Sequence, residues 1–477
     1  MKNTPLILFC SLVILSFFML TGCGPAEEEN PTSSDPTDTN DDSADDADED
    51  EGEVGDEDED ADADDEQEAT PPVDVETEPA EDPTEGENPA DPQTEEVDVS
   101  EMIEMLDPPE PQVDPTAELM VAIIEANPDF DPNMAEAFAD ENGDVVYFKS
   151  ESPGLVDISP LEGMPLIVIH LPVSGVSDIT PLKGAPLKEA VLGSSQVSDL
   201  SPLSEAPIEV LSLSGSKKIT DLSPLEGLPL IAIELQETGI SDLSPLEGME
   251  LEAIFLGKTN VADLTPLAGM PLTMIDIHET AVTDLSPLEG APLAQLFLER
   301  TEISDLSPLK GMPLQELYIS ETDVSDLSPL EGMPLVQLNA VESQVVDLTP
   351  LRSMDQLRML WLNDTPVKDV TSLAWPPLES VTLAGTEIDD LTALANSTTI
   401  QRIHIAKTKV TDLTPLGGMP QLTRLIFTPA EITDGIEVIR EMRSIQELGT
   451  AFGTEEDGDV RYPPAEFWQR YDAGEFH

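Results

Sequence analysis

One sequence unit returns through most of this chain at intervals of 21 or 22 residues. The stretch DLSPLKGMPLQELYISETDVSDLSPLEGMPL, residues 305–335, contains two successive copies. An aspartate marks each copy, at Asp157, Asp178, Asp199, Asp221, Asp242, Asp263, Asp284, Asp305, Asp326, Asp347, Asp369, Asp390, Asp412 and Asp434. A recurrence of this length indicates a solenoid, because one copy cannot bury its apolar side chains until the next copy stacks on it.

An apolar frame, L-x-x-L-x-L, has the same period, as in Leu314, Leu317 and Ile319. It is present from Leu166 to Ile445. Alternation at the L-x-L end predicts a short strand whose leucines point into a core. Stacked copies would then form one parallel sheet.

This pattern resembles the leucine-rich-repeat family, and specifically the short bacterial repeats of internalins, over about 300 residues. The resemblance implies an α/β-type solenoid, a leucine-rich-repeat rod with a parallel sheet on its concave side. A repeat of 21–22 residues has no room for a full helix, so we expect 3₁₀ turns on the convex side. The rod is expected over residues 144–450.

The segment D-L-S/T-P-L-x-G predicts how each turn is made. We expect the serine to act as N-cap, the proline to open the turn and the glycine to end it. A glutamate three residues after the serine would complete a capping box in five copies, at Glu162, Glu226, Glu247, Glu289 and Glu331. The aspartate can accept the backbone N–H two residues later. Calcium binding by the aspartate column is the alternative, but each copy supplies only one carboxylate.

The N-terminus reads MKNTPLILFCSLVILSFFML-TGC, one lysine and an apolar run that ends in Leu-Thr-Gly-Cys. It resembles the lipobox of bacterial lipoproteins, which implies a signal peptide over 1–22 and lipidation of Cys23. The chain would then be an extracytoplasmic, membrane-anchored lipoprotein. The resemblance further implies the outer membrane or the cell surface, because Gly24 follows Cys23 where an aspartate would act as an inner-membrane retention signal. An uncleaved anchor helix is the alternative.

Acidic residues dominate the next segment, residues 23–112. Between Gly24 and Glu110 there are 39 Asp and Glu and no Lys or Arg, within a formal net charge of −79 for the whole chain. Such a composition predicts a disordered, self-repelling linker; loose binding of cations or polymers is the alternative. Nucleic acid is excluded as a partner on this charge balance, because its phosphates require clustered basic residues.

Two segments flank the repeats. DPTAELMVAIIEAN, residues 114–127, has helical apolar spacing and predicts a helical N-terminal cap over 113–143. At the other end PPAEFWQRYDAGEFH resembles a closing segment of planctomycete-type repeat proteins, which implies a C-terminal cap over 451–477. A partner-binding tail is the alternative for its aromatic residues.

The outward residues of the strands supply the candidate site. We predict a concave binding face that consists of Phe255, Asp276, His278, Phe297, Tyr318, Asn339, Trp361 and His404. Aromatic residues at solvent-facing positions of so acidic a chain are typical of interfaces, although they could simply cover neighbouring strands.

The sequence contains no zinc spacing, phosphate loop or hydrolase elbow, so we expect no enzyme, metal or cofactor. The expected function is that of a lipid-anchored, monomeric cell-envelope protein whose repeat surface binds a protein or glycan. The alternative is a structural envelope spacer without a specific ligand.

Overall fold

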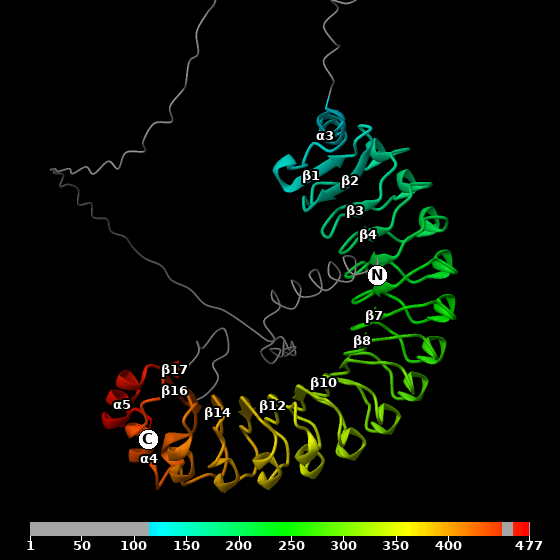
Figure 1. Ribbon diagram of the computed structural model, residues 1–477. Helices are drawn as coiled ribbons and strands as arrows, with labels where there is room; N and C mark the ends of the chain where they lie inside the picture. The colour runs from blue at the N-terminus through cyan, green and yellow to red at the C-terminus, as the bar shows by residue number, and fades with distance from the viewer. Residues whose placement is uncertain (1–113, 451–460, 477) are drawn as a thin grey trace, which may run out of the picture. The chain divides into compact units, whose positions relative to one another are not determined.

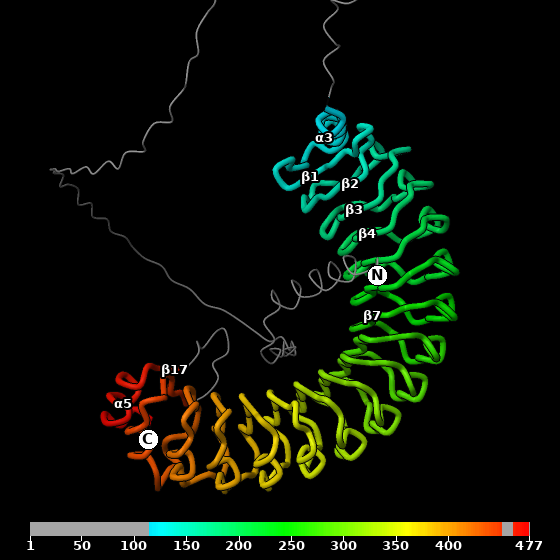
Figure 2. Tube along the Cα trace, viewed as in Figure 1, coloured from blue at the N-terminus to red at the C-terminus, as the bar shows by residue number. Residues whose placement is uncertain are grey.

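The computed structural model describes residues 114–450 and 461–476. Within this part of the chain, the repeats coil into a curved solenoid with strands on the inner side and turns on the outer side (Figure 1). Each repeat is one coil of the Cα trace (Figure 2). The predicted signal peptide, Cys23 and the acidic linker lie outside the described residues.

One sheet of 17 strands runs through the described residues. The strands are β1 (Ala135–Ala139), β2 (Val145–Ser150), β3 (Val168–His170), β4 (Glu189–Val191), β5 (Val210–Ser212), β6 (Ala232–Glu234), β7 (Ala253–Phe255), β8 (Met274–Asp276), β9 (Gln295–Phe297), β10 (Glu316–Tyr318), β11 (Gln337–Asn339), β12 (Met359–Trp361), β13 (Ser380–Thr382), β14 (Arg402–His404), β15 (Arg424–Ile426), β16 (Glu447–Gly449) and β17 (Arg461–Tyr462). Consecutive strands from β2 to β16 pair in parallel, with Leu317 opposite Leu296 and Leu338, for example. The predicted parallel concave sheet is confirmed.

Single 3₁₀ turns occupy the convex side, as predicted. They span Ser159–Leu161, Thr180–Leu182, Ser201–Leu203, Ser223–Leu225, Ser244–Leu246, Thr265–Leu267, Ser286–Leu288, Ser307–Leu309, Ser328–Leu330, Thr349–Ser353, Thr371–Ala374, Thr392–Leu394 and Thr414–Gly418. Further 3₁₀ turns, Pro132–Met134 and Pro429–Glu431, lie near the two ends. Side chains of the strands and turns meet in one continuous apolar core, in which Leu309 and Leu317 are fully buried.

The aspartate, and not the serine, caps each turn, so the predicted capping box is wrong. Oδ1 of Asp305 accepts a hydrogen bond from the backbone N–H of Ser307 at 2.8 Å, and the same contact recurs in every copy from Asp157 to Asp412. Ser307 is already the first residue of the turn, and its hydroxyl donates to Asp305 at 2.9 Å. The predicted turn-fixing role of the aspartate is confirmed.

Glycine ends the turn because the backbone there is left-handed. Gly311 has φ +80°, and no atom lies near the position of an added Cβ. Conformation alone therefore selects glycine at this position. From β6 to β14, each strand is followed by a Thr or Ser whose role is structural, as predicted: the hydroxyl of Thr322, for example, donates to the carbonyl of Ile319 at 2.7 Å.

The ends of the solenoid differ from its repeats. The predicted N-terminal helix is present as α3 (Pro115–Ala126), but the remainder of the expected helical cap is a 3₁₀ turn and strand β1. Strand β1 pairs antiparallel with β2 through a turn at Gly143, whose φ is +85°. This hairpin covers the edge strand of the sheet.

At the other end, α4 (Ile436–Glu441) replaces a 3₁₀ turn and α5 (Pro464–Asp472) follows β17. Strand β17 pairs antiparallel with β16. Phe467 of α5 is fully buried, with its ring centroid 5.7 Å from that of Phe427. No helix of the described residues combines the length and apolar character needed to cross a bilayer.

Candidate binding surface on the concave sheet

The parallel register places seven of the eight predicted face residues in one column across the sheet. Phe255, Asp276 and Phe297 are in register on β7, β8 and β9. The column continues through Tyr318, Asn339, Trp361, Thr382 and His404. His278 lies in the next outward column, two residues after Asp276.

Four members of the predicted face are buried, so the expectation that they face solvent is wrong. The exposed fraction is 2% for Phe255, 7% for Phe297, 4% for Asp276 and 6% for His404. The strands lie on the inner side of the curve, where outward side chains converge. Large rings there cover the neighbouring strands, which was the alternative explanation for them.

Tyr318 and Trp361 are half-buried and remain accessible from the concave side. The ring centroids of Phe297 and Tyr318 are 4.9 Å apart, and those of Tyr318 and Trp361 are 6.4 Å apart. We call Phe297, Tyr318 and Trp361 the aromatic row. The Tyr318 hydroxyl donates to Oε1 of Gln337 at 3.2 Å, which orients the central ring.

An acidic cluster, Asp276, His278 and Glu299, lies beside the aromatic row on the side of β8. Nδ1 of His278 is 2.7 Å from Oδ1 of Asp276, and the His278 backbone N–H donates to the same oxygen at 3.0 Å. The imidazole lies directly over Gly257, where an added Cβ would be 2.0 Å from Cε1 of the ring. Gly257 thus leaves the space that His278 occupies.

Burial and neighbouring charges shift the protonation of this cluster. Burial raises the pKa of Glu299 to about 7, helped by the negative charge of Asp276, and Glu299 Oε2 has no hydrogen-bond partner in the described residues. Burial lowers the pKa of His278, but the hydrogen bond and the charge of Asp276 outweigh it, so that the net shift is upward. The cluster therefore changes its charge near neutral pH.

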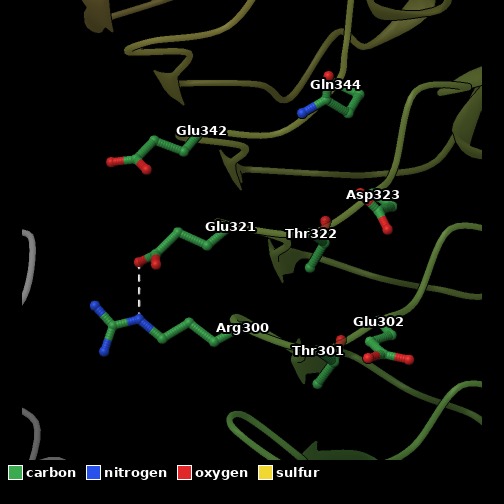
Figure 3. Close-up of a pocket in the computed structure, with 8 residues that line it drawn as sticks. All are labelled: Arg300, Thr301, Glu302, Glu321, Thr322, Asp323, Glu342 and Gln344. Carbon is green, nitrogen blue, oxygen red and sulfur yellow. Dashed lines mark hydrogen bonds and ion pairs between the residues drawn. The ribbon is translucent and has the colours of Figure 1, made fainter.

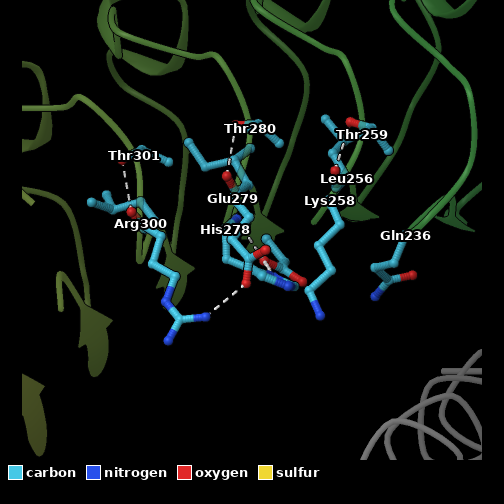
Figure 4. A network of polar contacts seen from close by, with 12 residues as sticks. Gln236, Leu256, Lys258, Thr259, His278, Glu279, Thr280, Arg300 and Thr301 are labelled. Atoms are coloured by element: carbon cyan, nitrogen blue, oxygen red, sulfur yellow. Dashed lines mark hydrogen bonds and ion pairs between the residues drawn. The ribbon is translucent and has the colours of Figure 1, made fainter. Parts of the chain in front are cut away.

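Charged residues form a ladder along one rim of the sheet. Arg300 donates to Glu279 at 3.1 Å (Figure 4). It also donates to Glu321 at 2.8 Å, so that one guanidinium joins three successive repeats. Lys258 lies 4.0 Å from Glu237 at the next position of the same ladder. These exposed pairs contribute little stability each, and they leave a polar rim of mixed charge beside the aromatic row.

Beyond this rim, a cavity of about 560 Å³ opens between the loops that follow β9, β10 and β11. Half of its lining residues are acidic, with Glu302, Asp323 and Glu342 on successive repeats and Arg300 paired to Glu321 (Figure 3). In residues 114–450 and 461–476, no group of three or more His, Cys, Asp or Glu side chains is placed to hold a metal ion.

A smaller cavity of about 150 Å³ lies on the concave sheet between β12 and β15. We call it the arginine pocket; its lining includes Trp361, Thr382, Arg402, His404 and Arg424. It joins two predicted residues, Trp361 and His404, with two arginines that sequence reasoning missed. Each arginine lies two residues before the central column, Arg402 on β14 and Arg424 on β15, and both side chains point outward. The sequence signal that could have revealed them was the presence of arginine at the same position of two adjacent repeats.

Many solved structures are similar to this chain, among them the following three. An internalin (InlF) of Listeria monocytogenes is 20% identical over 71% of this chain and 95% of its own, with a TM-score of 0.50. A leucine-rich-repeat protein of Leptospira interrogans is 16% identical over 61% and 84%, with a TM-score of 0.48. A plant peptide hormone receptor, RGFR1, solved in complex with RGF2, is 13% identical over 61% and 60%, with a TM-score of 0.45.

The likeness to the internalin shows that the chain has the leucine-rich-repeat fold. No protein-family model matches the sequence, and a search of curated proteins finds no match.

Proposed function

We propose that this chain is a binding module that presents its concave sheet to a segment of a partner protein, tethered to the cell envelope through a lipid on Cys23. Leucine-rich-repeat proteins generally use their concave surfaces for interactions. The observation that carries the proposal is the aromatic row, of which Tyr318 and Trp361 are accessible at the centre of the sheet. Accessible Tyr and Trp side chains are enriched among the residues that dominate binding energy.

The surroundings of the row support a polypeptide ligand in particular. The acidic cluster lies at the β8 end of the row, and the arginine pocket begins at Trp361, at its other end. Along the backbone of the sheet, β8 and β14 are six strand spacings apart, roughly 29 Å. An extended segment of about nine residues spans this distance. A glycan remains the second ligand class, since aromatic rings also stack on sugars, but it would not use opposite charges at the two ends.

The N-terminal sequence supports the tether. An apolar run followed by Leu-Thr-Gly-Cys fits a lipoprotein signal peptide, and the acidic segment after Cys23 would hold the solenoid away from the membrane. We do not propose an enzyme, because the cluster of Asp276, His278 and Glu299 lines neither cavity. If the chain were a spacer without a ligand, the accessibility of the Tyr318 and Trp361 rings would have no explanation.

The test is capture of envelope proteins by the full chain, compared with the double variant Tyr318→Ala/Trp361→Ala. We expect the double variant to lose a partner that the wild type retains. The matched control is Trp375→Ala, which removes an exposed tryptophan from the convex side, next to the turn Thr371–Ala374. Equal capture by all three forms, with unchanged circular dichroism, would favour the spacer.

A further inference from the structure

Two arginines lie side by side at the C-terminal end of the concave sheet. Arg402 of β14 is in register with Arg424 of β15. Like charges directly opposite each other destabilise a strand pair. Arg424 is compensated by Glu447 of β16, which also lies 3.6 Å from Arg461. Arg402 has an exposed side chain and forms no ion pair within the part of the chain that the structure describes.

The arginine pocket beside Arg402 has the properties of a small site for a polar group. Trp361 and Ile426 form apolar walls, and the pocket is about 150 Å³ in volume. Thr382 is 94% buried, since its exposed fraction is 6%, and its hydroxyl oxygen has no hydrogen-bond partner among the described residues. A buried hydroxyl without a partner costs stability unless a ligand supplies one.

The charge of the pocket is positive although the chain is strongly acidic. Burial lowers the pKa of His404 to about 4, so at neutral pH His404 lines the pocket as an uncharged ring. The two guanidinium groups are then the charged groups of the lining. In a chain of formal net charge −79, with 20 basic residues against 99 acidic ones, adjacent arginines in one pocket contrast with the surrounding charge.

We propose that the arginine pocket receives the side-chain carboxylate of an Asp or Glu residue in the bound polypeptide. Arg402 is the charge partner, because its planar guanidinium matches a carboxylate with two parallel N–H···O bonds. The Thr382 hydroxyl supplies a further donor, and the Trp361 ring contacts the adjacent apolar residue of the ligand. One unpaired guanidinium in so small a pocket suits a singly charged, planar group better than a phosphate.

This inference deepens the proposed function and rests on it. The test is a display library of random nine-residue peptides, selected on the detergent-solubilised full chain. We expect the wild type to enrich peptides that carry Asp or Glu next to an apolar residue. Arg402→Gln should lower the enrichment of the acidic residue by about tenfold and keep the apolar preference. The matched control is Arg443→Gln, which removes an exposed arginine that lines neither cavity.

Three outcomes would be decisive. Loss of the acidic preference with Arg402→Gln, and its persistence with Arg443→Gln, supports the inference. If the enriched peptides depend on Trp361 but are neutral or basic, or if Arg402→Gln does not change them, the carboxylate inference is overturned. The proposed function would still stand in that case. A library without any peptide that depends on Trp361 contradicts the proposed function itself. Thermal unfolding should show Arg402→Gln no less stable than the wild type, whereas a structural arginine would lower the midpoint.

Discussion

The rings of Tyr318 and Trp361 stack with centroids 6.4 Å apart, although a whole strand, β11, lies between the strands that carry them. Two strand spacings amount to about 9.6 Å. The rings therefore lean toward each other over Asn339, as the inward curvature of the sheet allows. The aromatic row is a product of curvature, and two rings from non-adjacent repeats form one surface.

This contact predicts energetic coupling between the two side chains. In a double-mutant cycle of Tyr318→Ala and Trp361→Ala, measured by denaturant unfolding, we expect a coupling free energy of about 0.5–1.5 kcal/mol. A double-mutant cycle of Tyr318→Ala with Trp375→Ala, whose tryptophan lies on the convex side, should give a coupling free energy near zero. Additive effects for Tyr318 and Trp361 would mean that the two rings do not stack in solution.

The aspartate column predicts a role in turn stability without calcium. Asp305→Ala should lower the thermal midpoint, since the N–H of Ser307 loses its acceptor, while Asp305→Asn keeps an acceptor oxygen and should stay close to the wild type. Added calcium should change none of these midpoints. A midpoint that calcium raises in the wild type and not in Asp305→Ala would instead assign the column to metal binding.

The pH dependence of the aspartates has a defined sign. The backbone hydrogen bond from Ser307 is the main cause that lowers the pKa of Asp305 below 3.8. Because the pKa of Asp305 is lower in the folded state than in the unfolded state, the ionised carboxylate stabilises the fold at any pH above its unfolded-state pKa. This stabilisation is lost as the pH falls through the folded-state pKa. Loss of stability below about pH 4 is therefore part of the same prediction.

Glu299 should act in the opposite direction. Burial raises the pKa of this carboxyl from 4.5 to about 7, so the folded state keeps a proton that the unfolded state has released between these values. Stability should therefore fall as the pH rises from 4.5 to 7. Glu299→Gln should raise the thermal midpoint at pH 8 and leave it nearly unchanged at pH 4.5. The control is the exposed Glu302→Gln; an equal effect of both would contradict the burial of Glu299.

The lipid tether makes a separate prediction, on residues outside those the structure describes. Cys23→Ser should abolish incorporation of labelled fatty acid and retain the precursor with its signal peptide. Cys10→Ser, the matched control within the predicted signal peptide, should be processed and labelled normally. Labelling that survives Cys23→Ser would exclude the lipoprotein assignment and favour an uncleaved anchor.

Much of the solenoid could be predicted because its determinants are local and repeated. Leu317 and Ile319 alternate with outward residues, and Gly311 ends a turn for a conformational reason that is independent of the other repeats. The capping of the turn was misassigned to Ser307, since both Asp305 and Ser307 are good capping residues and only the backbone geometry distinguishes them. The hairpin of β1 and β2 was missed because it occurs only once, so no repetition in the sequence points to it.

The candidate site was harder to predict, since exposure depends on curvature. The sequence places Phe297 and Tyr318 in equivalent positions, yet Phe297 is buried beneath its neighbours and Tyr318 is accessible. Arg402 lies outside the central column that sequence reasoning followed. Its significance depends on the register with Arg424 and on which acidic residue already pairs with that arginine.

Site-specific photo-cross-linking on whole cells tests the central claim most directly. A photo-reactive residue at Glu316, beside the aromatic row on β10, should form a covalent adduct with a discrete partner protein. The same residue at Glu331, an exposed glutamate on the convex side, should form none. The Glu316 adduct should disappear with Trp361→Ala. Adducts of equal yield at both positions, or an adduct at Glu331 alone, would contradict a binding role of the concave sheet.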